Sequence, residues 1–353
     1  MTVKPVNNPL IALDVMGGDA GLPDVMAAAE VASERYPALR FRLHGPEARI
    51  RAEFARCPRL SATAVVVHTD DVVLGTDRPS QALRRSRTSS MGMAIQAVKD
   101  GDAHAAVSAG NTGALMAMAL FALRTMPGID RPALAALLPT LKNDVAVLDL
   151  GANTECDAEN LVQFAVMGAA FARTVLGLET PRVGLLNIGE EELKGTNGLR
   201  DAAALLRGAK LPMHFEGFVE GDKIGQGDVD VIVTDGFSGN IALKTAEGTA
   251  KLVTGLLRHA FRSTWLTRIG YLLSRSALQA LRTHLDPNAH NGAVFLGLNG
   301  LVVKSHGSAN VRGIANAIGV AHDLIVGRVG DRIADDLANF RAHRPDVPAA
   351  TAK

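Results

Sequence analysis

The feature of this 353-residue chain that most constrains its fold is a repeated unit: an apolar strand, a short loop of Gly, Ser, Thr and Asn, and then a helix. Strands that alternate with helices in this way are typical of a parallel sheet built from βαβ units. Three such loops follow predicted strands at 105–108, 229–234 and 301–303, and a fourth follows the strand at 145–148. The repeated unit therefore predicts an α/β protein with a mostly parallel sheet.

The same loops indicate a binding chemistry. They read Ser108–Ala114, Asp149–Asn153, Thr234–Asn240 and Ser305–Asn310. Unpaired backbone N–H groups at a helix N-terminus, together with the helix dipole, stabilise an anion. One loop of this kind is also explained by ordinary helix capping. Several loops on one parallel sheet favour a shared pocket for a phosphate-like group.

Composition and missing motifs exclude several classes of protein. The net charge of +1 gives no overall bias toward nucleic acid, and the two cysteines fit a reduced cytoplasm better than a disulfide framework. The chain lacks the motifs of a P-loop, a dinucleotide fold, a zinc site and a serine-hydrolase elbow. No signal-peptide pattern and no run of 18 uncharged apolar residues occurs. We therefore expect a cytoplasmic protein with no metal, no cofactor and no nucleic-acid partner.

Three titratable residues near strand ends are the candidate catalytic groups. His306 is flanked by glycine and serine after a strand, which suits acid–base chemistry. Lys194, in a glycine-flanked loop, either supplies positive charge to a phosphate or is a solvated lysine beside the acidic residues 190–192. Asp235 ends an apolar strand and is either a helix cap or the partner of another functional group. Cys156 has no neighbouring histidine in sequence and is expected to be a small buried residue.

The stretch from 248 to 285 departs from the strand–helix rhythm, because it carries cations among apolar residues, the only Trp and no acidic residue. We expect a basic amphipathic helical hairpin over about residues 248–290 that protrudes from the sheet. Two compatible interpretations remain open: a dimer interface or solvated helix pair, and contact with an anionic membrane surface or an acidic carrier protein. The second interpretation assigns that contact to Arg258, Arg262, Trp265, Arg268 and Arg275.

Short motifs along nearly the whole chain, from about residue 10 to 330, resemble the PlsX phosphate acyltransferases. They are Asp14–Asp19, Arg78–Ser80 with Arg84 and Arg85, Ser108–Ala114, Asp149–Asn153, Asn187–Gly189 with Lys194 and Gly195, Thr234–Asn240, and Ser305–Ser308. The departures are small: Val15 stands where Ala is more usual, and both ends of the chain differ. None of these departures touches the loops.

The resemblance implies an enzyme that transfers a long-chain fatty acyl group from acyl-[acyl carrier protein] to inorganic phosphate, giving acyl phosphate for glycerol-3-phosphate acylation in phospholipid synthesis. It also implies a three-layer α/β/α fold similar to phosphotransacetylases and isopropylmalate dehydrogenases, a homodimer, and peripheral association with the inner face of the cell membrane. We expect one catalytic domain over residues 1–341 and a flexible tail over 342–353. Two alternatives are a phosphotransacylase that uses acyl-CoA and a non-catalytic membrane scaffold of lipid synthesis.

This reaction needs no nucleophilic side chain, because phosphate is itself the attacking group. The enzyme must bind the dianion beside the thioester carbonyl and stabilise the tetrahedral oxyanion. We assign the positive charge to Lys194, the orientation of phosphate or protonation of the departing thiol to His306, and the orientation of either residue to Asp235. The residues expected to bind phosphate or the oxyanion are Asn111, Thr112, Gly113, Asn153, Gly236, Asn240 and Ser305.

Overall fold

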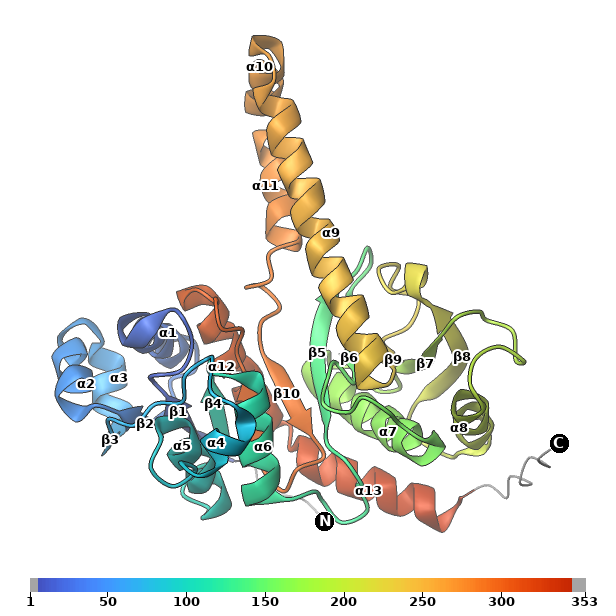
Figure 1. Ribbon diagram of the computed structural model, residues 1–353, viewed down its shortest axis with the longest axis horizontal. Coiled ribbons are helices and arrows are strands. Elements are labelled where there is room, and N and C mark those ends of the chain that lie inside the picture. The colour runs from blue at the N-terminus through green and yellow to red at the C-terminus, as the bar shows by residue number, and fades with distance from the viewer. Residues whose placement is uncertain (1–5, 345–353) are drawn as a thin grey trace.

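A computed structural model describes residues 6–344 and contains an 11-stranded sheet with helices on both of its faces (Figure 1). The strand order is β3-β2-β1-β4-β11-β10-β5-β6-β9-β7-β8. The strands are β1 (Leu10–Asp14), β2 (Arg40–Gly45), β3 (Ala64–His68), β4 (Ala105–Ser108), β5 (Ala133–Pro139), β6 (Asp144–Leu148), β7 (Arg182–Asn187), β8 (His214–Glu220), β9 (Val231–Val233), β10 (Ala293–Leu296) and β11 (Leu301–Lys304). The predicted α/β class with a mostly parallel sheet is confirmed.

The helices complete the alternation that the sequence predicted. They are α1 (Gly21–Arg35), α2 (Glu47–Glu53), α3 (Pro58–Thr63), α4 (Pro79–Leu83), α5 (Ser90–Lys99), α6 (Thr112–Leu123), α7 (Ala158–Val175), α8 (Asn197–Gly208), α9 (Gly236–Arg262), α10 (Trp265–Leu273), α11 (Arg275–His284), α12 (Val311–Val326) and α13 (Val329–Ala342). The last residues of the predicted tail, 345–353, and residues 1–5 lie outside the described part of the chain.

Side chains that alternate along the strands form two apolar cores, one on each face of the sheet. On β1, Ile11 and Leu13 belong to the core beneath α1, α7 and α12, whereas Ala12 belongs to the core beneath α5 and α6. This alternation follows from the two-residue period of a strand. Burial of both faces explains why the strands read as nearly continuous apolar runs.

The sheet is not parallel throughout, and this separates the predicted loops. The group β3-β2-β1-β4-β11 is parallel, as is the group β6-β9-β7-β8. Between these groups, β10 is antiparallel to both β11 and β5, and β5 is antiparallel to β6. Three reversals in succession make the two parallel groups run in opposite directions. The four loops therefore leave opposite edges of the sheet instead of sharing one edge.

Residues 236–284 leave the sheet as three helices that form a protruding arm (Figure 1). Helix α9 begins at Gly236 instead of near Asn240, because Asp235 caps it by accepting a hydrogen bond from the Ser238 N–H at 2.8 Å. Phe261 and Tyr271 pack edge to face with ring centroids 5.7 Å apart and join α9 to α10. The predicted contact residues on the arm are all exposed: Arg258, Arg262, Trp265, Arg268 and Arg275.

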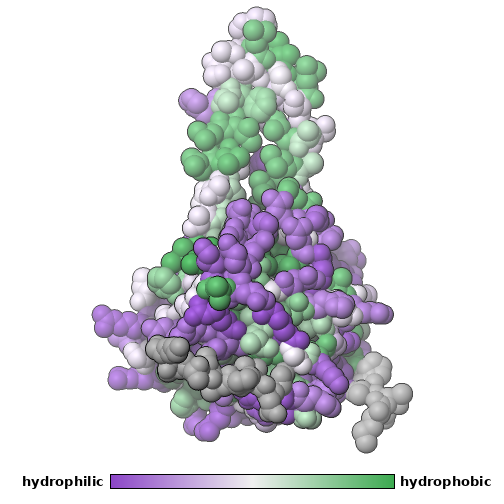
Figure 2. Space-filling model, turned by 90° about the vertical axis from the view of Figure 1, so that its right-hand side faces the viewer, coloured by the Kyte–Doolittle hydropathy of each residue, from purple (hydrophilic) through white to green (hydrophobic). Residues whose placement is uncertain are grey.

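The arm exposes many apolar side chains, which Figure 2 shows as a green surface above a largely hydrophilic body. The most exposed of them include Leu252, Leu256, Trp265, Leu266, Leu272 and Leu273, at 61–80% of their full accessible area. No helix between residues 6 and 344 has both the length and the apolarity needed to cross a bilayer.

A buried histidine near the end of β2 makes stability depend on pH. His44 is 1% exposed, and neither ring nitrogen has a hydrogen-bond partner. Burial, and to a smaller extent the charge of Arg42, lowers its pKa from 6.5 to about 4. Between these values the unfolded chain binds a proton at this position and the folded chain does not. The free energy of unfolding therefore falls as the pH drops from about 6.5 to about 4.

We predict that His44→Leu removes this part of the acid sensitivity. The wild-type protein should lose about 2 to 3 kcal/mol more unfolding free energy than His44→Leu between pH 7 and pH 4. Urea denaturation at several pH values measures the difference. His214→Gln, at an exposed position, is the control and should keep the wild-type slope. Equal slopes for wild type and His44→Leu would contradict the prediction.

Candidate active site

The first loop cluster comprises residues 14–19, 108–113 and 304–308, which follow β1, β4 and β11. In the sheet, β1 lies between β2 and β4. The chain adds β2 and β3 on one side of β1 and then adds β4 on the other side, so the strand order switches direction at β1. The crevice outside the carboxyl ends of two such strands is the usual ligand site of open α/β sheets. Two backbone hydrogen bonds join the three loops, from Asp19 N to Gly307 O at 2.9 Å and from Ser305 N to Ser108 O at 2.9 Å.

Asp14 is the buried centre of the first loop cluster. Its carboxylate is 2% exposed and accepts hydrogen bonds from the Ser90 hydroxyl at 2.6 Å and the Ser108 hydroxyl at 2.7 Å. Burial raises the pKa of Asp14, and these donors oppose the rise. Ser108 in turn accepts the Gly110 N–H at 3.0 Å. The carboxylate therefore fixes the start of the loop that leads into α6.

Glycine is required where these loops cross. A Cβ at Gly17 would lie 2.5 Å from an Asp14 carboxylate oxygen and 2.8 Å from the Gly110 nitrogen. Gly18 has a φ of 91°, and a Cβ there would lie 2.8 Å from the Ala109 side chain. The loops after β1 and β4 are thus packed backbone against backbone.

Lys304 also belongs to this cluster, one strand beyond Ser108 from Asp14, and is 7% exposed. It pairs with Ser108 in the register of β11 and β4. Its ammonium donates to the carbonyl oxygen of Ala109 at 3.3 Å and to that of Ser305. Burial lowers the pKa of Lys304 to about 8, against the charges of Asp14 and Asp19, which raise it. Lys304 is not among the residues predicted from the sequence.

His306 is exposed at the mouth of the first loop cluster. Its Nδ1 lies 3.2 Å from the Ser308 N–H, which can only donate, so Nδ1 is the acceptor and the neutral ring carries its proton on Nε2. Partial burial is the main cause that lowers the pKa of His306, and Lys304 lowers it further while Glu247 raises it. The imidazole is therefore a neutral hydrogen-bond donor at physiological pH.

The other predicted residues of the first loop cluster fall into two groups. Thr112 and Gly113 are exposed at the start of α6, where backbone N–H groups are unpaired by the helix. The side chains of Asn111 and Ser305 are engaged within the fold. Asn111 caps α6 and donates to the Gly75 and Asp77 carbonyl oxygens at 2.8 and 3.2 Å. Ser305 is fully buried and accepts from Asn291 at 2.8 Å.

The second loop cluster comprises residues 149–156, 187–196 and 234–240, which follow β6, β7 and β9. Its centre is Asp149, which is fully buried and accepts five hydrogen bonds, all from N–H donors, at 2.7–3.1 Å. Burial raises the pKa of Asp149 and the donated hydrogen bonds oppose the rise. Asn153 supplies two of the donors, and its carbonyl oxygen accepts the Gly236 N–H at 2.7 Å.

Of the residues predicted here, Lys194 and Asn240 have exposed side chains and Asp235 is half-buried. Lys194 forms no ion pair within residues 6–344, and its carbonyl oxygen accepts from Asn187 at 3.2 Å. Both carboxylate oxygens of Asp235 accept from Ser238, through its N–H and its hydroxyl. In the described chain no hydrogen bond joins Asp235 to Lys194 or to His306. Asn240 lies against Gly151, where a Cβ would be 3.6 Å from its side chain.

Negative charge in the second loop cluster acts on Cys156. Burial and the nearby carboxylates of Asp149 and Asp235 raise the pKa of this thiol to about 12. A thiol in this state holds almost no thiolate at neutral pH and is a poor nucleophile. This agrees with the expectation that Cys156 is not the attacking group.

Helix α9 begins in the second loop cluster and brings charged side chains near His306 of the first. Its first turn contacts the second cluster through Gly236 and Asn240. Two turns later, Lys244, Glu247 and Lys251 lie close enough to His306 for their charges to affect its pKa. No hydrogen bond or ion pair between described residues joins the clusters directly. Helix α9 is thus an element that lies near both clusters.

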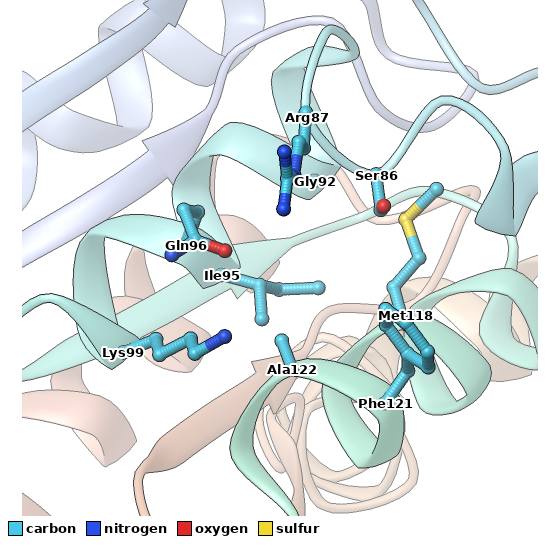
Figure 3. A pocket seen from close by; sticks show the side chains of 9 residues that line it. All are labelled: Ser86, Arg87, Gly92, Ile95, Gln96, Lys99, Met118, Phe121 and Ala122. Carbon is cyan, nitrogen blue, oxygen red and sulfur yellow. The ribbon is translucent and has the colours of Figure 1, made fainter.

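A separate groove lies between α5 and α6 (Figure 3). Arg87 and Lys99 point toward a floor made by Ile95 and Ala122, and Phe121 stands at its rim. None of the predicted site residues lines this groove. Its lining is Ser86, Arg87, Gly92, Ile95, Gln96, Lys99, Met118, Phe121 and Ala122.

Comparisons with known proteins agree with the sequence motifs. The family model described as "Fatty acid synthesis protein" matches residues 10–332. The phosphate acyltransferase of Erythrobacter litoralis is 60% identical over 334 residues, covering 94% of both chains. That of Rhodospirillum centenum is 57% identical over 332 residues, again covering 94% of both chains.

A solved phosphotransacetylase from Streptococcus pyogenes has a similar fold. Its TM-score is 0.61 at 17% identity, over 91% of this chain and 95% of that one. This likeness supports the predicted phosphotransacetylase-like fold. With the full-length match to the family model and the high identity to its relatives, the chain belongs to the fatty acid synthesis protein (PlsX) family of phosphate acyltransferases.

Proposed function

We propose that this acyltransferase moves a long-chain fatty acyl group from acyl-[acyl carrier protein] to inorganic phosphate, and so makes acyl phosphate for phospholipid synthesis. The observation that carries the proposal is the first loop cluster. It combines glycine-lined backbone, a helix N-terminus and a neutral histidine donor at the switch point of the sheet. Relatives of 51–60% identity carry the name phosphate acyltransferase.

The charges around the two loop clusters favour a different substrate for each of them. In the first cluster Lys304 opposes the charges of Asp14 and Asp19. Near the histidine of that cluster Lys244 and Lys251 outnumber Glu247, so the cluster accepts the phosphate dianion more readily. The second cluster holds Asp149 and Asp235 near Cys156, which would repel a dianion bound among them. We assign phosphate to Thr112, Gly113 and His306, and the acyl thioester to the neighbourhood of Lys194 and Asn240.

The reaction then needs only positioning and electrostatics. A phosphate oxygen attacks the thioester carbonyl carbon, and the new C–O bond gives a tetrahedral oxyanion. The C–S bond breaks as the carbonyl reforms, and the departing sulfur leaves as thiolate or takes the Nε2 proton of His306. A thiol with a pKa of about 8.5 leaves readily, so strong acid catalysis is not required. Asp235 remains a candidate positioning residue through its cap on α9.

A second candidate donor is acyl-CoA, because the structural neighbours include phosphotransacetylases of similar fold. Hydroxylamine converts acyl phosphate to a hydroxamate and tests both donors. Long-chain acyl carrier protein should give hydroxamate only when phosphate is present. Product from acyl-CoA but not from acyl carrier protein would favour the second candidate, and phosphate-independent product would reject both.

We predict that His306→Ala and Lys194→Met each lower kcat/KM by about a hundredfold, which is the usual effect of losing one donor to a transition-state anion. Phosphate-dependent hydroxamate formation measures the loss. Lys210→Met, at an exposed position just past the C-terminal end of α8, is the control for removal of a lysine charge. Turnover within twofold of wild type in both variants would remove these residues from the mechanism.

We also propose that the arm carries the peripheral contacts: an anionic membrane surface, the acidic carrier protein and a second copy of the chain. Support comes from its exposed apolar side chains and from the lack of acidic residues between 248 and 285. An amphipathic, cationic surface of this kind binds anionic lipid through both apolar burial and charge.

Reversing three arm charges with Arg262→Glu, Arg268→Glu and Arg275→Glu should weaken binding to anionic vesicles at least a hundredfold, at about 1 kcal/mol for each neutralised charge. Vesicle co-sedimentation measures this. The matched control reverses the exposed body residues Arg49, Arg87 and Arg312. If arm and control variants bind vesicles and carrier protein like wild type, the arm has no such role.

A further inference from the structure

Four side chains form a row across the parallel strands at the carboxyl edge of the sheet: His44 on β2, Asp14 on β1, Ser108 on β4 and Lys304 on β11. The strand registers pair Asp14 with His44 and Ser108 with Lys304. All four are at most 7% exposed. The row thus places a lysine beneath the loops that the proposed function assigns to phosphate.

We propose that Lys304 is a positioning residue that sets the affinity of the first loop cluster for inorganic phosphate. The inference rests on the proposed function, because it treats inorganic phosphate as the substrate of the first loop cluster and Lys304 as the positive charge that favours its binding. Lys304 acts from below the loops: it holds the Ala109 carbonyl oxygen at 3.3 Å and also the Ser305 carbonyl oxygen. The two loops it joins are those that lead to Thr112 and to His306.

The charges around Lys304 show why its loss would matter. Asp14 at the end of β1 and Asp19 in the loop that follows lie close enough for their negative charges to raise the pKa of Lys304. Near His306, the charges of Lys304, Lys244 and Lys251 lower the histidine pKa and that of Glu247 raises it. Without the ammonium, the negative charges of Asp14 and Asp19 near these loops would lose the buried cation that opposes them. Coulomb repulsion at this partly buried position would weaken phosphate binding strongly.

The placement also distinguishes Lys304 from Lys194. Lys194 is exposed in a loop of the second cluster, with Glu190, Glu191 and Glu192 nearby in sequence. A solvated lysine on a flexible stem is screened by water and salt, whereas a lysine held by two carbonyl oxygens keeps a fixed position. Lys304 should therefore govern phosphate affinity, while Lys194 should govern use of the acyl donor.

Equilibrium binding of inorganic phosphate to the full chain tests this without requiring turnover. Lys304→Met should raise the phosphate Kd at least tenfold, and Lys304→Arg should restore it to within a few-fold of wild type. The matched controls Lys99→Met and Lys99→Arg, at an exposed position on α5, should bind phosphate like wild type. In turnover, Lys304→Met should raise the KM for phosphate and leave the KM for the acyl thioester within twofold.

The pH profile gives a readout that a purely structural role would not move. Since burial holds the pKa of Lys304 at about 8, phosphate affinity of the wild type should fall above pH 8, where phosphate itself is already a dianion. Arginine stays protonated, so Lys304→Arg should remove that fall.

Three outcomes overturn the inference. One is an unchanged phosphate Kd in a folded Lys304→Met protein. Another is an equal rise in both KM values, which indicates general loosening of the site. The third outcome decides the case if Lys304→Met does not fold. It is that Lys304→Arg loses phosphate affinity above pH 8 as much as the wild type does. Absence of phosphate-dependent hydroxamate with normal phosphate binding would reject the proposed function instead.

Discussion

The antiparallel placement of β10 between β11 and β5 is the constraint on which the arrangement of this molecule depends. Its hydrogen bonds help to join the two parallel groups of strands into one sheet. The antiparallel pairs of β10 and β5 make the strands of the second group run in the opposite direction to those of the first. A uniformly parallel sheet would have put every glycine-rich loop at one edge. Here they form two clusters, and α9 begins in the second cluster and places charged side chains near His306 of the first.

Each cluster is organised around a buried carboxylate with a different kind of donor shell. Asp14 accepts from two hydroxyl groups and the Met16 N–H, and it lies near a buried lysine. Asp149 accepts five N–H donors and has another carboxylate, Asp235, in its surroundings. Hydrogen bonds to charged groups contribute about 1.5 to 3 kcal/mol each, so both carboxylates hold their loops firmly. The difference in surrounding charge is what assigns phosphate to the first cluster.

Much of the fold could be predicted because local patterns determine it. The strands at 64–68 and 105–108 and the β5–β6 hairpin follow from apolar runs bounded by turn residues. Strand β10 has only four residues, and a run of that length cannot show its direction or partners. The division of the glycine-rich loops into two clusters could not be predicted for that reason.

The site could be predicted in part. The glycines of the loops made the loops recognisable in the sequence. Lys304, which is buried beneath two of them, was not predicted, because a lysine at the end of an apolar strand usually marks only the end of that strand. Lys304 is recognisable only when the register sets it beside Ser108 and under Ala109. The side chains of Asn111, Asn153 and Ser305, chosen as ligands from their residue types, are engaged in hydrogen bonds within the fold.

The central claim is that phosphate binds in the first loop cluster, and the position of a bound phosphate analogue tests it most directly. Arsenate has the shape and charge of phosphate, and its arsenic atom is located unambiguously by anomalous X-ray scattering from a crystal of the protein. The account predicts an arsenic peak beside the start of α6, within hydrogen-bond reach of Thr112, Gly113 or His306. A peak confined to the second cluster, beside Lys194 and Asp235, would contradict it.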